Sequence, residues 1–410
     1  MNILFLTEQF PYPLHDGGNL RTFHILKGLC EHHNVTMVSH AAADNPDEAI
    51  AALSELCEVV AVKEPSVSRR VMSNLIRNRF RPPLFVIKNA SDAILNVADQ
   101  LISQRNFDAI HMNMLDTAFF ALKRPWQVPL VFDSHNCLAQ IAEGVRDRAR
   151  NPFRRVVFAR ESRALRRCES EVASRMNLTL VCSNNDARLF SDIADNAHCI
   201  VAPNGVDSDF FSPSDLETNP DQLVFTGSMS YFPNEEGALW FAHQVLPLLK
   251  TKRPSVCVDL VGRTPPASLQ KLHDGRSINV TGTVADVRPF VHRASVFIVP
   301  LQTGGGTRLK ILEAFSMGKA VVSTSKGAEG IPVEHGHQIL IADSPAEFAT
   351  AIEELMASPE KRAEMGHAAR RLVEECFDWK SVQEKVHQGY QQLSDARVPR
   401  DQKSIPLVNK

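Results

Sequence analysis

The sequence predicts an α/β fold made of two doubly wound, Rossmann-like domains that face each other across a cleft. At 410 residues the chain exceeds a typical single core and fits two domains of about 200 residues each. Apolar, strand-like runs alternate with helix-like segments, which is typical of parallel sheets with right-handed crossovers. The pattern restarts after residues 200–222, a segment rich in Pro, Asn, Asp and Ser, and this composition indicates turns and a linker.

The first domain is expected to span residues 1–203. Its predicted strands are 2–7, 35–40, 59–63, 107–113, 128–135 and 178–183. Several of them are apolar at consecutive positions, as strands buried on both faces should be. The segment after the first strand has Phe23, Leu26, Leu29 and Cys30 at helical spacing, which predicts a helix.

The second domain is expected to span residues 204–377. Its predicted strands are 223–228, 256–262, 278–282, 296–301 and 320–324, with a helix from about 235 to 250. From Pro345 on, the sequence reads as two or three helices. We expect the last of them, 378–394, to return to the first domain, and residues 395–410 to form a disordered tail.

The composition is that of an ordinary globular protein, with 44% hydrophobic and 22% charged residues. A formal net charge of −2 gives no basic field for nucleic acid. The eight cysteines are scattered without a CxxC pair, which favours reduced thiols over disulfides or zinc. No apolar run approaches the ~20 residues that span a bilayer, and the N-terminal ten residues lack the basic region of a signal peptide. We therefore expect a cytoplasmic protein.

The strongest chemical signal is the stretch TGGGTRLKILEAF, residues 303–315. Glycines 304 to 306 let a ligand approach the backbone, and Thr307 can cap a helix whose first N–H groups then face an anion. Arg308 and Lys310 add positive charge, and Glu313 lies on the same helical face as Lys310. The stretch predicts a diphosphate at the helix start with a sugar diol held by Glu313. A flexible turn with a surface Lys–Glu pair is an equally compatible interpretation.

Four further residues are candidates from their place in the pattern. Gly17 and Gly18 lie in DGGN, between the first strand and the first helix, where a phosphate-type loop and a simple tight turn are both plausible. His111 and His135 lie at strand ends, although a lone histidine is more often structural. The other histidines are scattered and indicate no metal site.

Four segments together resemble the family 4 retaining glycosyltransferases of the GT-B fold. They are LTEQFPYPLHDGGNLRT, PNGVDSDFFSP, FTGSMSYFPNEEGALWFAHQVLPLL and GGGTRLKILEAFSMGKAVVSTSKGAEGI, which occur in the family's order over nearly the whole chain. The resemblance implies a metal-independent hexosyl-type transferase without a cofactor. A nucleotide-diphospho-sugar donor would bind the C-terminal domain, and a saccharide or lipid-linked acceptor the N-terminal one. Synthesis of a bacterial-type polysaccharide or glycoconjugate is the implied role.

The resemblance also assigns residues. His135 matches a cleft histidine that approaches the transferred sugar, and Glu313 matches the second of two glutamates eight apart, which contacts the donor ribose. The first glutamate falls on Gly305, so this sequence departs from the family. The first loop of the C-terminal domain lacks the usual Arg and Lys, and Arg308 and Lys310 are the implied replacements. The implied donor contacts are Gly227, Ser228, Val284, Gly304, Gly305, Gly306, Thr307 and Leu309, and the implied acceptor or cleft residues are Gly17, Gly18 and His111.

Two other functions remain open at this point. One is a catalytically impaired GT-B binding or scaffold protein, which the missing first glutamate favours. The other is a GT-B nucleotide-sugar epimerase or hydrolase, which would need a placed acid/base set, whereas the NGVD turn and the GGGTRLKILEAF turn favour transfer.

Two arginine-rich segments have no place in this assignment. Residues 146–167 hold nine arginines against Asp147 and Glu161, and residues 69–83 hold five more. Such segments can rest on anionic lipid at the inner face of a membrane. They can also be solvated helix faces or a site for an acidic acceptor.

Overall fold

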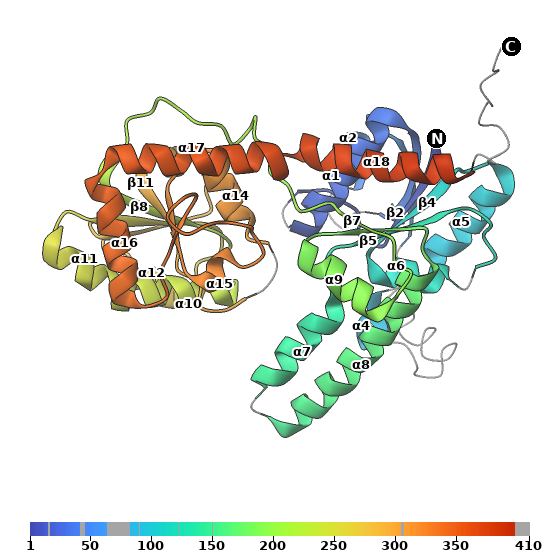
Figure 1. Ribbon diagram of the computed structural model, residues 1–410, viewed down its shortest axis with the longest axis horizontal. Coiled ribbons are helices and arrows are strands. Elements are labelled where there is room, and N and C mark those ends of the chain that lie inside the picture. Colours follow the sequence, from blue (N-terminus) through green and yellow to red (C-terminus); the bar gives the residue numbers. More distant parts are fainter. Residues whose placement is uncertain are drawn as a thin grey trace, which may run out of the picture. The chain divides into compact units, whose positions relative to one another are not determined.

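The computed structural model describes residues 1–14, 17–41, 46–63, 83–89, 91–122, 124–149, 151–304 and 307–397. The chain divides into two compact units (Figure 1). Unit 1 comprises Met1–Pro203 and the chain from Val382 onward, and unit 2 comprises Asn204–Ser381. The arginine-rich segment 69–83 lies, except for Pro83, outside the described residues.

Unit 1 is built on a seven-stranded parallel sheet with the order β3-β2-β1-β4-β5-β6-β7. The strands are β1 (Asn2–Thr7), β2 (Asn34–His40), β3 (Glu58–Val62), β4 (Ala109–Asn113), β5 (Leu130–Ser134), β6 (Leu178–Val181) and β7 (Cys199–Val201). The helices are α1 (Gly17–His32), α2 (Pro46–Ser54), α4 (Leu84–Asn89), α5 (Asp92–Gln104), α6 (Met114–Ala121), α7 (Leu138–Arg148), α8 (Pro152–Arg175) and α9 (Asn184–Ile193). The last helix, α18 (Trp379–Arg397), begins in unit 2 and continues into unit 1.

Unit 2 repeats this topology with six parallel strands in the order β10-β9-β8-β11-β12-β13. The strands are β8 (Asn219–Thr226), β9 (Cys257–Val261), β10 (Ile278–Gly282), β11 (Ala294–Val299), β12 (Val321–Ser323) and β13 (Leu340–Ile341). The helices are α10 (Phe232–Trp240), a π-helical turn (Phe241–Val245), α11 (Leu246–Lys252), α12 (Ala267–Gln270), α13 (Arg288–Arg293), α14 (Leu309–Ser316), α15 (Ser325–Ala328), α16 (Pro345–Ala357) and α17 (Pro359–Cys376).

The predicted fold class is confirmed: the chain contains two doubly wound parallel sheets. Each predicted strand is present, with ends shifted by at most four residues. Two strands were missed, because β7 lies in the polar linker segment and β13 has only two residues. At the other end, α18 continues to Arg397, so residues 395–397 are helical and do not belong to the predicted tail.

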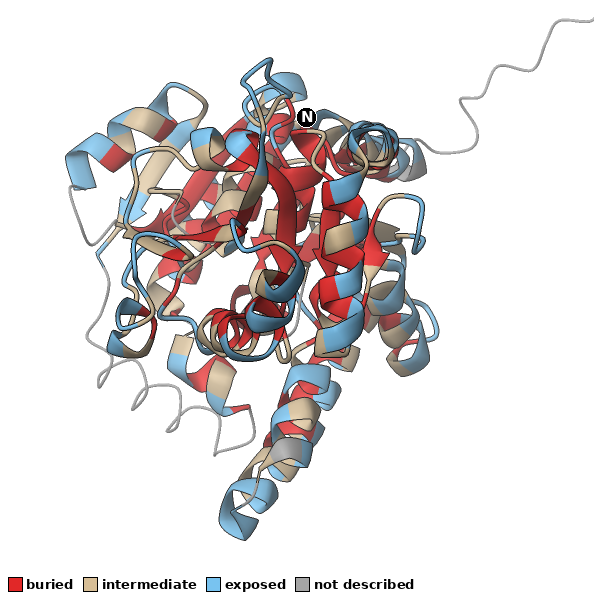
Figure 2. Ribbon diagram, turned by 90° about the vertical axis from the view of Figure 1, so that its left-hand side faces the viewer, coloured by how far each residue is buried: buried red, intermediate tan, exposed pale blue. Residues whose placement is uncertain are grey.

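Each unit has an apolar core against its sheet, and the central strands are deeply buried (Figure 2). All five residues of β4 and all six of β11 are buried. This burial on both faces explains why the strands read as continuous apolar runs rather than as an alternating pattern.

The C-terminal helix packs closely on unit 1 at a glycine of α1. A Cβ added at Gly28 would lie 2.3 Å from Cγ of Gln383, so only a bare backbone fits there. The Gln383 side-chain amide donates a hydrogen bond to the carbonyl oxygen of His24. The last helix is therefore an integral layer of unit 1.

In unit 2 the turns after β8 and β9 lie in direct contact. Gly227 N–H donates to the Val261 carbonyl oxygen, and Met229 N–H donates to that of Arg263. A Cβ added at Gly262 would lie 1.6 Å from the carbonyl oxygen of Gly227. The glycine at 262 is thus required for the carboxyl ends of the two strands to meet.

The substitution Gly262→Ala should destabilise unit 2 strongly, because backbone rather than a flexible side chain occupies the space for the methyl group. We expect the free energy of unfolding to fall by about 3 kcal/mol or more. Gly144→Ala in α7 is the matched control, since nothing lies within 4 Å of its Cβ position. Urea unfolding of the two variants provides the measurement, and equal stability would contradict this account of the turn.

Candidate functional site

The strand order of each sheet reverses at its centre, between β1 and β4 in unit 1 and between β8 and β11 in unit 2. In open parallel sheets, ligands bind outside the carboxyl ends of the strands at this switch point. Polar residues gather there in both units.

In unit 2, the side chain of Asn234 connects the turn after β8 to helix α14. Its Nδ2 donates to the carbonyl oxygen of Ser228 at 2.8 Å, and its Oδ1 accepts a hydrogen bond from Lys310 Nζ at 2.8 Å. The Lys310 ammonium also lies 4.2 Å from the ring centroid of Phe225, a favourable cation–π position. A Cβ at Gly227 would lie 2.7 Å from Lys310 Nζ. Gly227 therefore leaves room for the cation beside the turn.

Lys310 and Glu313 are both half-buried one helical turn apart. Burial lowers the pKa of Lys310 to about 7, although the Glu313 carboxylate acts in the opposite direction. Burial likewise raises the pKa of Glu313 to about 6, against the influence of Lys310. Each charge is therefore incompletely compensated, and an anion beside Lys310 would favour its protonated form.

Arg308 precedes α14 and is 8% exposed. A Cβ at Gly304 would lie 3.0 Å from a terminal nitrogen of Arg308, so the guanidinium lies against the first glycine of the turn. The expected cap is not present: α14 begins at Leu309, and Arg308, not Thr307, occupies the N-cap position. Gly305 and Gly306 lie outside the described residues.

The remaining predicted donor contacts are also at this edge of the sheet. Gly227 and Ser228 form the turn after β8, and Thr307 and Leu309 lie at the start of α14. Val284 follows β10 and packs partly against the core of unit 2. Contacts join Gly227 and Ser228 to Lys310, directly or through Asn234, and join Gly304 to Arg308.

In unit 1, a buried ion pair connects α1 to the end of β5. The Arg21 side chain is 1% exposed, and its nitrogens lie 2.6 and 3.1 Å from Oδ1 of the fully buried Asp133. A third nitrogen donates to the carbonyl oxygen of Ala202 at 2.7 Å. Burial alone would raise the pKa of Asp133, but the Arg21 guanidinium and the neighbouring His135 outweigh it and hold this pKa well below its usual range.

His135 lies next to this ion pair, with a side chain 8% exposed. Its Nε2 lies 2.8 Å from Asn113 Oδ1 and 3.6 Å from Asp133 Oδ2. The orientation of the Asn113 amide follows from its other contacts, because Nδ2 lies 3.0 Å from Thr7 Oγ1 and 3.2 Å from Thr22 Oγ1.

Both of those hydroxyl groups already donate their protons, Thr7 to the carbonyl oxygen of Gln9 and Thr22 to that of Gly18. They must therefore accept from Asn113 Nδ2, which leaves Asn113 Oδ1 as the acceptor facing His135. The hydrogen-bond network thus assigns a proton to Nε2 of His135. In the neutral ring Nδ1 then carries the free lone pair.

His111 is fully buried, in contrast to the predicted position lining a cleft. Its ring stacks on Phe5 with centroids 4.4 Å apart, and its Nδ1 lies 2.8 Å from the hydroxyl of Tyr390 in α18. Its Nε2 is 4.0 Å from Asp133 Oδ2. Burial lowers the pKa of His111 to about 4. His111 is therefore an interior residue beside Asp133, without an exposed ring nitrogen.

Gly17 and Gly18 form the first residues of α1, directly after the undescribed residues 15 and 16. The Gly18 carbonyl oxygen accepts the hydrogen bond from Thr22 noted above. Their place near the end of β1 agrees with the predicted position between the first strand and the first helix.

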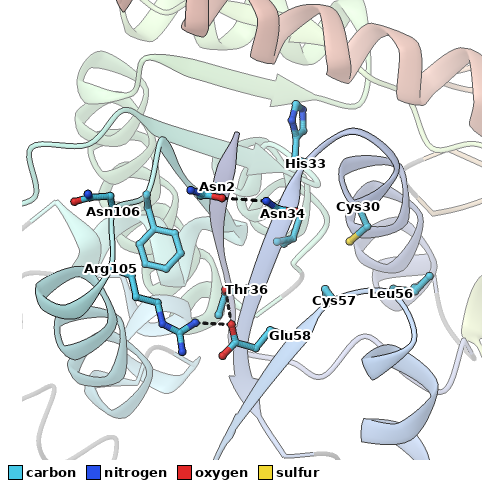
Figure 3. A pocket seen from close by; sticks show the side chains of 12 residues that line it. Asn2, Cys30, His33, Asn34, Thr36, Leu56, Cys57, Glu58, Arg105 and Asn106 are labelled. Carbon is cyan, nitrogen blue, oxygen red and sulfur yellow. Dashed lines mark hydrogen bonds and ion pairs between the residues drawn. The ribbon is translucent and has the colours of Figure 1, made fainter.

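A separate hollow of about 600 Å³ opens at the opposite, amino edge of the unit 1 sheet (Figure 3). Its Arg105 side chain is paired with Glu58 at 2.5 Å, and Thr36 donates to the same carboxylate at 3.0 Å (Figure 3). Because Glu58 neutralises the arginine, this hollow offers little attraction to a phosphate. The carboxyl edges of the sheets remain the better candidate site.

Within the described residues, His, Cys, Asp and Glu side chains form no group of three suited to holding a metal ion. Among the same residues, no helix combines the length and apolar character needed to cross a membrane. All eight cysteines fall in the described ranges, and none of them forms a disulfide there.

Two Rossmann-like units with polar switch points define the GT-B class of fold. The family model "Glycosyltransferase Family 4" matches residues 15–210, and "Glycosyl transferases group 1" matches residues 220–358. Together they match most of the chain, which belongs to the family 4, group 1 glycosyltransferases.

Similar proteins support the fold over nearly the full length. Sucrose-phosphate synthase from Thermosynechococcus elongatus superposes with a TM-score of 0.69 at 16% identity, covering 97% of this chain and 100% of the other. HepE from Anabaena in complex with UDP superposes with a TM-score of 0.66 at 15% identity, covering 96% and 100%. An uncharacterized 44.6 kDa protein in the cps region of Klebsiella pneumoniae is 27% identical over 168 residues, which span 39% of this chain and less than half, 43%, of the relative.

The sequence interpretation missed four residues that build these clusters: Asn234, Arg21, Asp133 and Asn113. Asn113 and Asp133 are polar residues at the ends of otherwise apolar strands, and this signal was available. Arg21 and Asn234 each lie in the first turns of a helix that follows the switch-point strand, where polar side chains face the ligand edge.

The buried His111 predicts a pH-dependent stability. Its folded pKa of about 4 lies below its unfolded value of 6.5, so the unfolded state binds the proton first and stability falls as the pH drops from 6.5 to 4. The loss should reach roughly 3 kcal/mol. His111→Phe, which preserves stacking on Phe5, should flatten this dependence in urea unfolding. The exposed control His243→Gln should keep the wild-type slope, and an unchanged slope in His111→Phe would contradict the assignment.

Proposed function

We propose that the protein is a retaining, metal-independent glycosyltransferase that moves a sugar from a nucleotide-diphospho-sugar to a saccharide or lipid-linked acceptor. The main observation in support is that Lys310 lies beside the bare backbone of Gly227 and Arg308 beside that of Gly304. It offers two cations and a helix start to one diphosphate at the switch point of unit 2.

The donor would bind unit 2 with its diphosphate against Arg308 and Lys310. Glu313, one helical turn further on, would accept hydrogen bonds from the ribose hydroxyls. The solved relative HepE holds UDP, which makes uridine nucleotides the first donors to test. The N–H groups at the start of α14 would complete the anion site.

Transfer would proceed on one face of the sugar. The bond between the anomeric carbon and the phosphate oxygen breaks, its electron pair leaves with the phosphate, and the acceptor hydroxyl oxygen bonds the same carbon. The proton of that hydroxyl passes to the departing phosphate oxygen. Arg308 and Lys310 would stabilise the negative charge that develops on the leaving group.

His135 would contact the transferred sugar or the acceptor from unit 1. Because Asn113 holds the Nε2 proton, Nδ1 of the neutral ring would accept a hydrogen bond from a sugar hydroxyl. Asp133, paired with Arg21, would keep the ring in this orientation. In this proposal Gly17 and Gly18 belong to the acceptor side, and His111 only supports Asp133.

The relative in the Klebsiella pneumoniae cps region makes polysaccharide synthesis in the cytoplasm the setting we propose. An impaired scaffold would differ from an active transferase in one assay. An active transferase should release sugar slowly from its donor without acceptor, whereas a scaffold should bind the donor without turnover.

Removal of the Lys310 cation should weaken donor binding. Lys310→Met should lower the affinity for a nucleoside diphosphate by about 10- to 100-fold, as expected for a charge-assisted hydrogen bond. Asn234→Ala should cause a smaller loss in the same direction, because it removes the acceptor that holds Lys310 in place. Calorimetric titration with UDP, GDP and ADP provides the measurement.

The exposed Lys271 of unit 2 supplies the control variant Lys271→Met, which should bind like wild type. A wild-type protein that binds none of the three diphosphates would refute the donor site. Unchanged affinity in Lys310→Met would remove this lysine from it.

The substitution His135→Ala should reduce turnover by about a hundredfold or more while donor affinity changes little, since the nucleotide is assigned to unit 2. His198→Ala, at an exposed histidine of unit 1, is the control. Turnover equal to wild type in His135→Ala would exclude a catalytic role. A parallel loss of donor affinity would indicate that the histidine serves donor binding instead.

A further inference from the structure

Helices α7 and α8 form a long hairpin that extends beyond the sheet of unit 1 (Figure 1). Its base is fixed by two buried carboxylates of α8. Glu169 accepts hydrogen bonds from the N–H groups of Leu138 and Ala139, at the start of α7. Glu161 accepts those of Leu84 and Phe85 in α4. The hairpin is therefore a firmly attached part of unit 1.

The far end of this hairpin is exposed (Figure 2) and carries two large apolar side chains. Asn151 caps α8 by accepting from the N–H of Phe153, and Pro152 follows as the first helical residue. Phe153 and Val156 are 75% and 69% exposed, the largest values among the exposed large hydrophobic residues of the described chain. Four of those ten residues lie on this hairpin, the other two being Ile141 and Val145 of α7. Scattered exposed apolar residues are normal, but Phe153 and Val156 are neighbours at the tip and are both strongly exposed, which indicates an interaction surface.

The apolar tip continues into a row of arginines. Phe153, Val156, Arg160, Arg163 and Arg167 follow one another at spacings of three and four, so they share one face of α8. All five are exposed. Glu161, in contrast, points inward with 7% exposure, so its negative charge is withdrawn from this face.

We propose that this face of α8, with the tip of the hairpin, is a docking surface for an anionic lipid bilayer. Phe153 and Val156 would enter the boundary between headgroups and acyl chains, and the three arginines would contact lipid phosphates. A second copy of the chain is a poor partner, because two such faces would bring like charges together. A soluble polyanion would use the arginines but would gain nothing from the two apolar side chains.

The test measures binding of the full chain to phosphatidylcholine vesicles with and without phosphatidylglycerol. The wild type should sediment with the anionic vesicles only, and less at high salt. The variant Arg160→Glu/Arg163→Glu/Arg167→Glu should bind at least about a hundredfold more weakly. The control Lys27→Glu/Lys271→Glu/Arg276→Glu changes the net charge equally at exposed positions elsewhere, and it should retain most of the binding. Unaltered thermal unfolding and nucleotide binding confirm that the variants are folded.

The variant Phe153→Ser/Val156→Ser separates a bilayer from a soluble anion. It should lose vesicle binding while its affinity for soluble polyphosphate stays unchanged. Three results would overturn the proposal: no vesicle binding by the wild type, equal losses in the arginine variant and its control, or full binding by the serine variant. A dimer in sedimentation velocity that dissociates in the arginine variant would assign the face to a second copy instead. None of these outcomes depends on sugar transfer.

Discussion

Both sheets reverse their strand order at the centre, and this topology leaves the carboxyl ends of two neighbouring strands uncovered in each unit. Backbone and side-chain polar groups exposed at that point need partners. Unit 1 supplies these partners itself. Arg21 of α1 pairs with Asp133 of β5, and Asn113 of β4 donates to the hydroxyl groups of Thr7 and Thr22. In unit 2, Gly227 and Gly262 bring two bare turns together beside Lys310, whose hydrogen-bond partner is the neutral amide of Asn234.

This difference sets the electrostatics of the two edges. Asp133 faces a guanidinium and stays ionised, so the unit 1 cluster is close to balanced. Lys310 is held by the neutral amide of Asn234, and burial lowers its pKa to about 7. A bound diphosphate would restore the charge of Lys310 and would be attracted by it in return. Unit 2 therefore has more to gain from an anion than unit 1, which agrees with a donor on one unit and a histidine contact on the other.

The sequence was sufficient for the strands because burial on both faces makes each of them an apolar run. It was insufficient where partners are distant in the chain. Arg21 and Asp133 are 112 residues apart, and the Tyr390 hydroxyl meets His111 across 279 residues. No local sequence pattern reveals contacts between residues so far apart in the chain. His111 was therefore expected to line a cleft, whereas it is buried. The cap at Arg308 rather than Thr307 is a local error, which lies within the ordinary uncertainty of helix ends.

The last helix makes the interior of unit 1 depend on the end of the chain. Gln383 fills the space opposite Gly28, and Tyr390 contacts His111 directly beneath Asp133 and His135. Without α18, the His111 Nδ1 would lose the Tyr390 hydroxyl as its hydrogen-bond partner. The loss of this helix would also expose the ring, and both changes would weaken the stacked, neutral state of His111 on Phe5. The orientation of His135 follows from Asp133 and Asn113, which belong to the same layer. His135, in the first half of the sequence, is thus positioned in part by residues from the last tenth of the described chain.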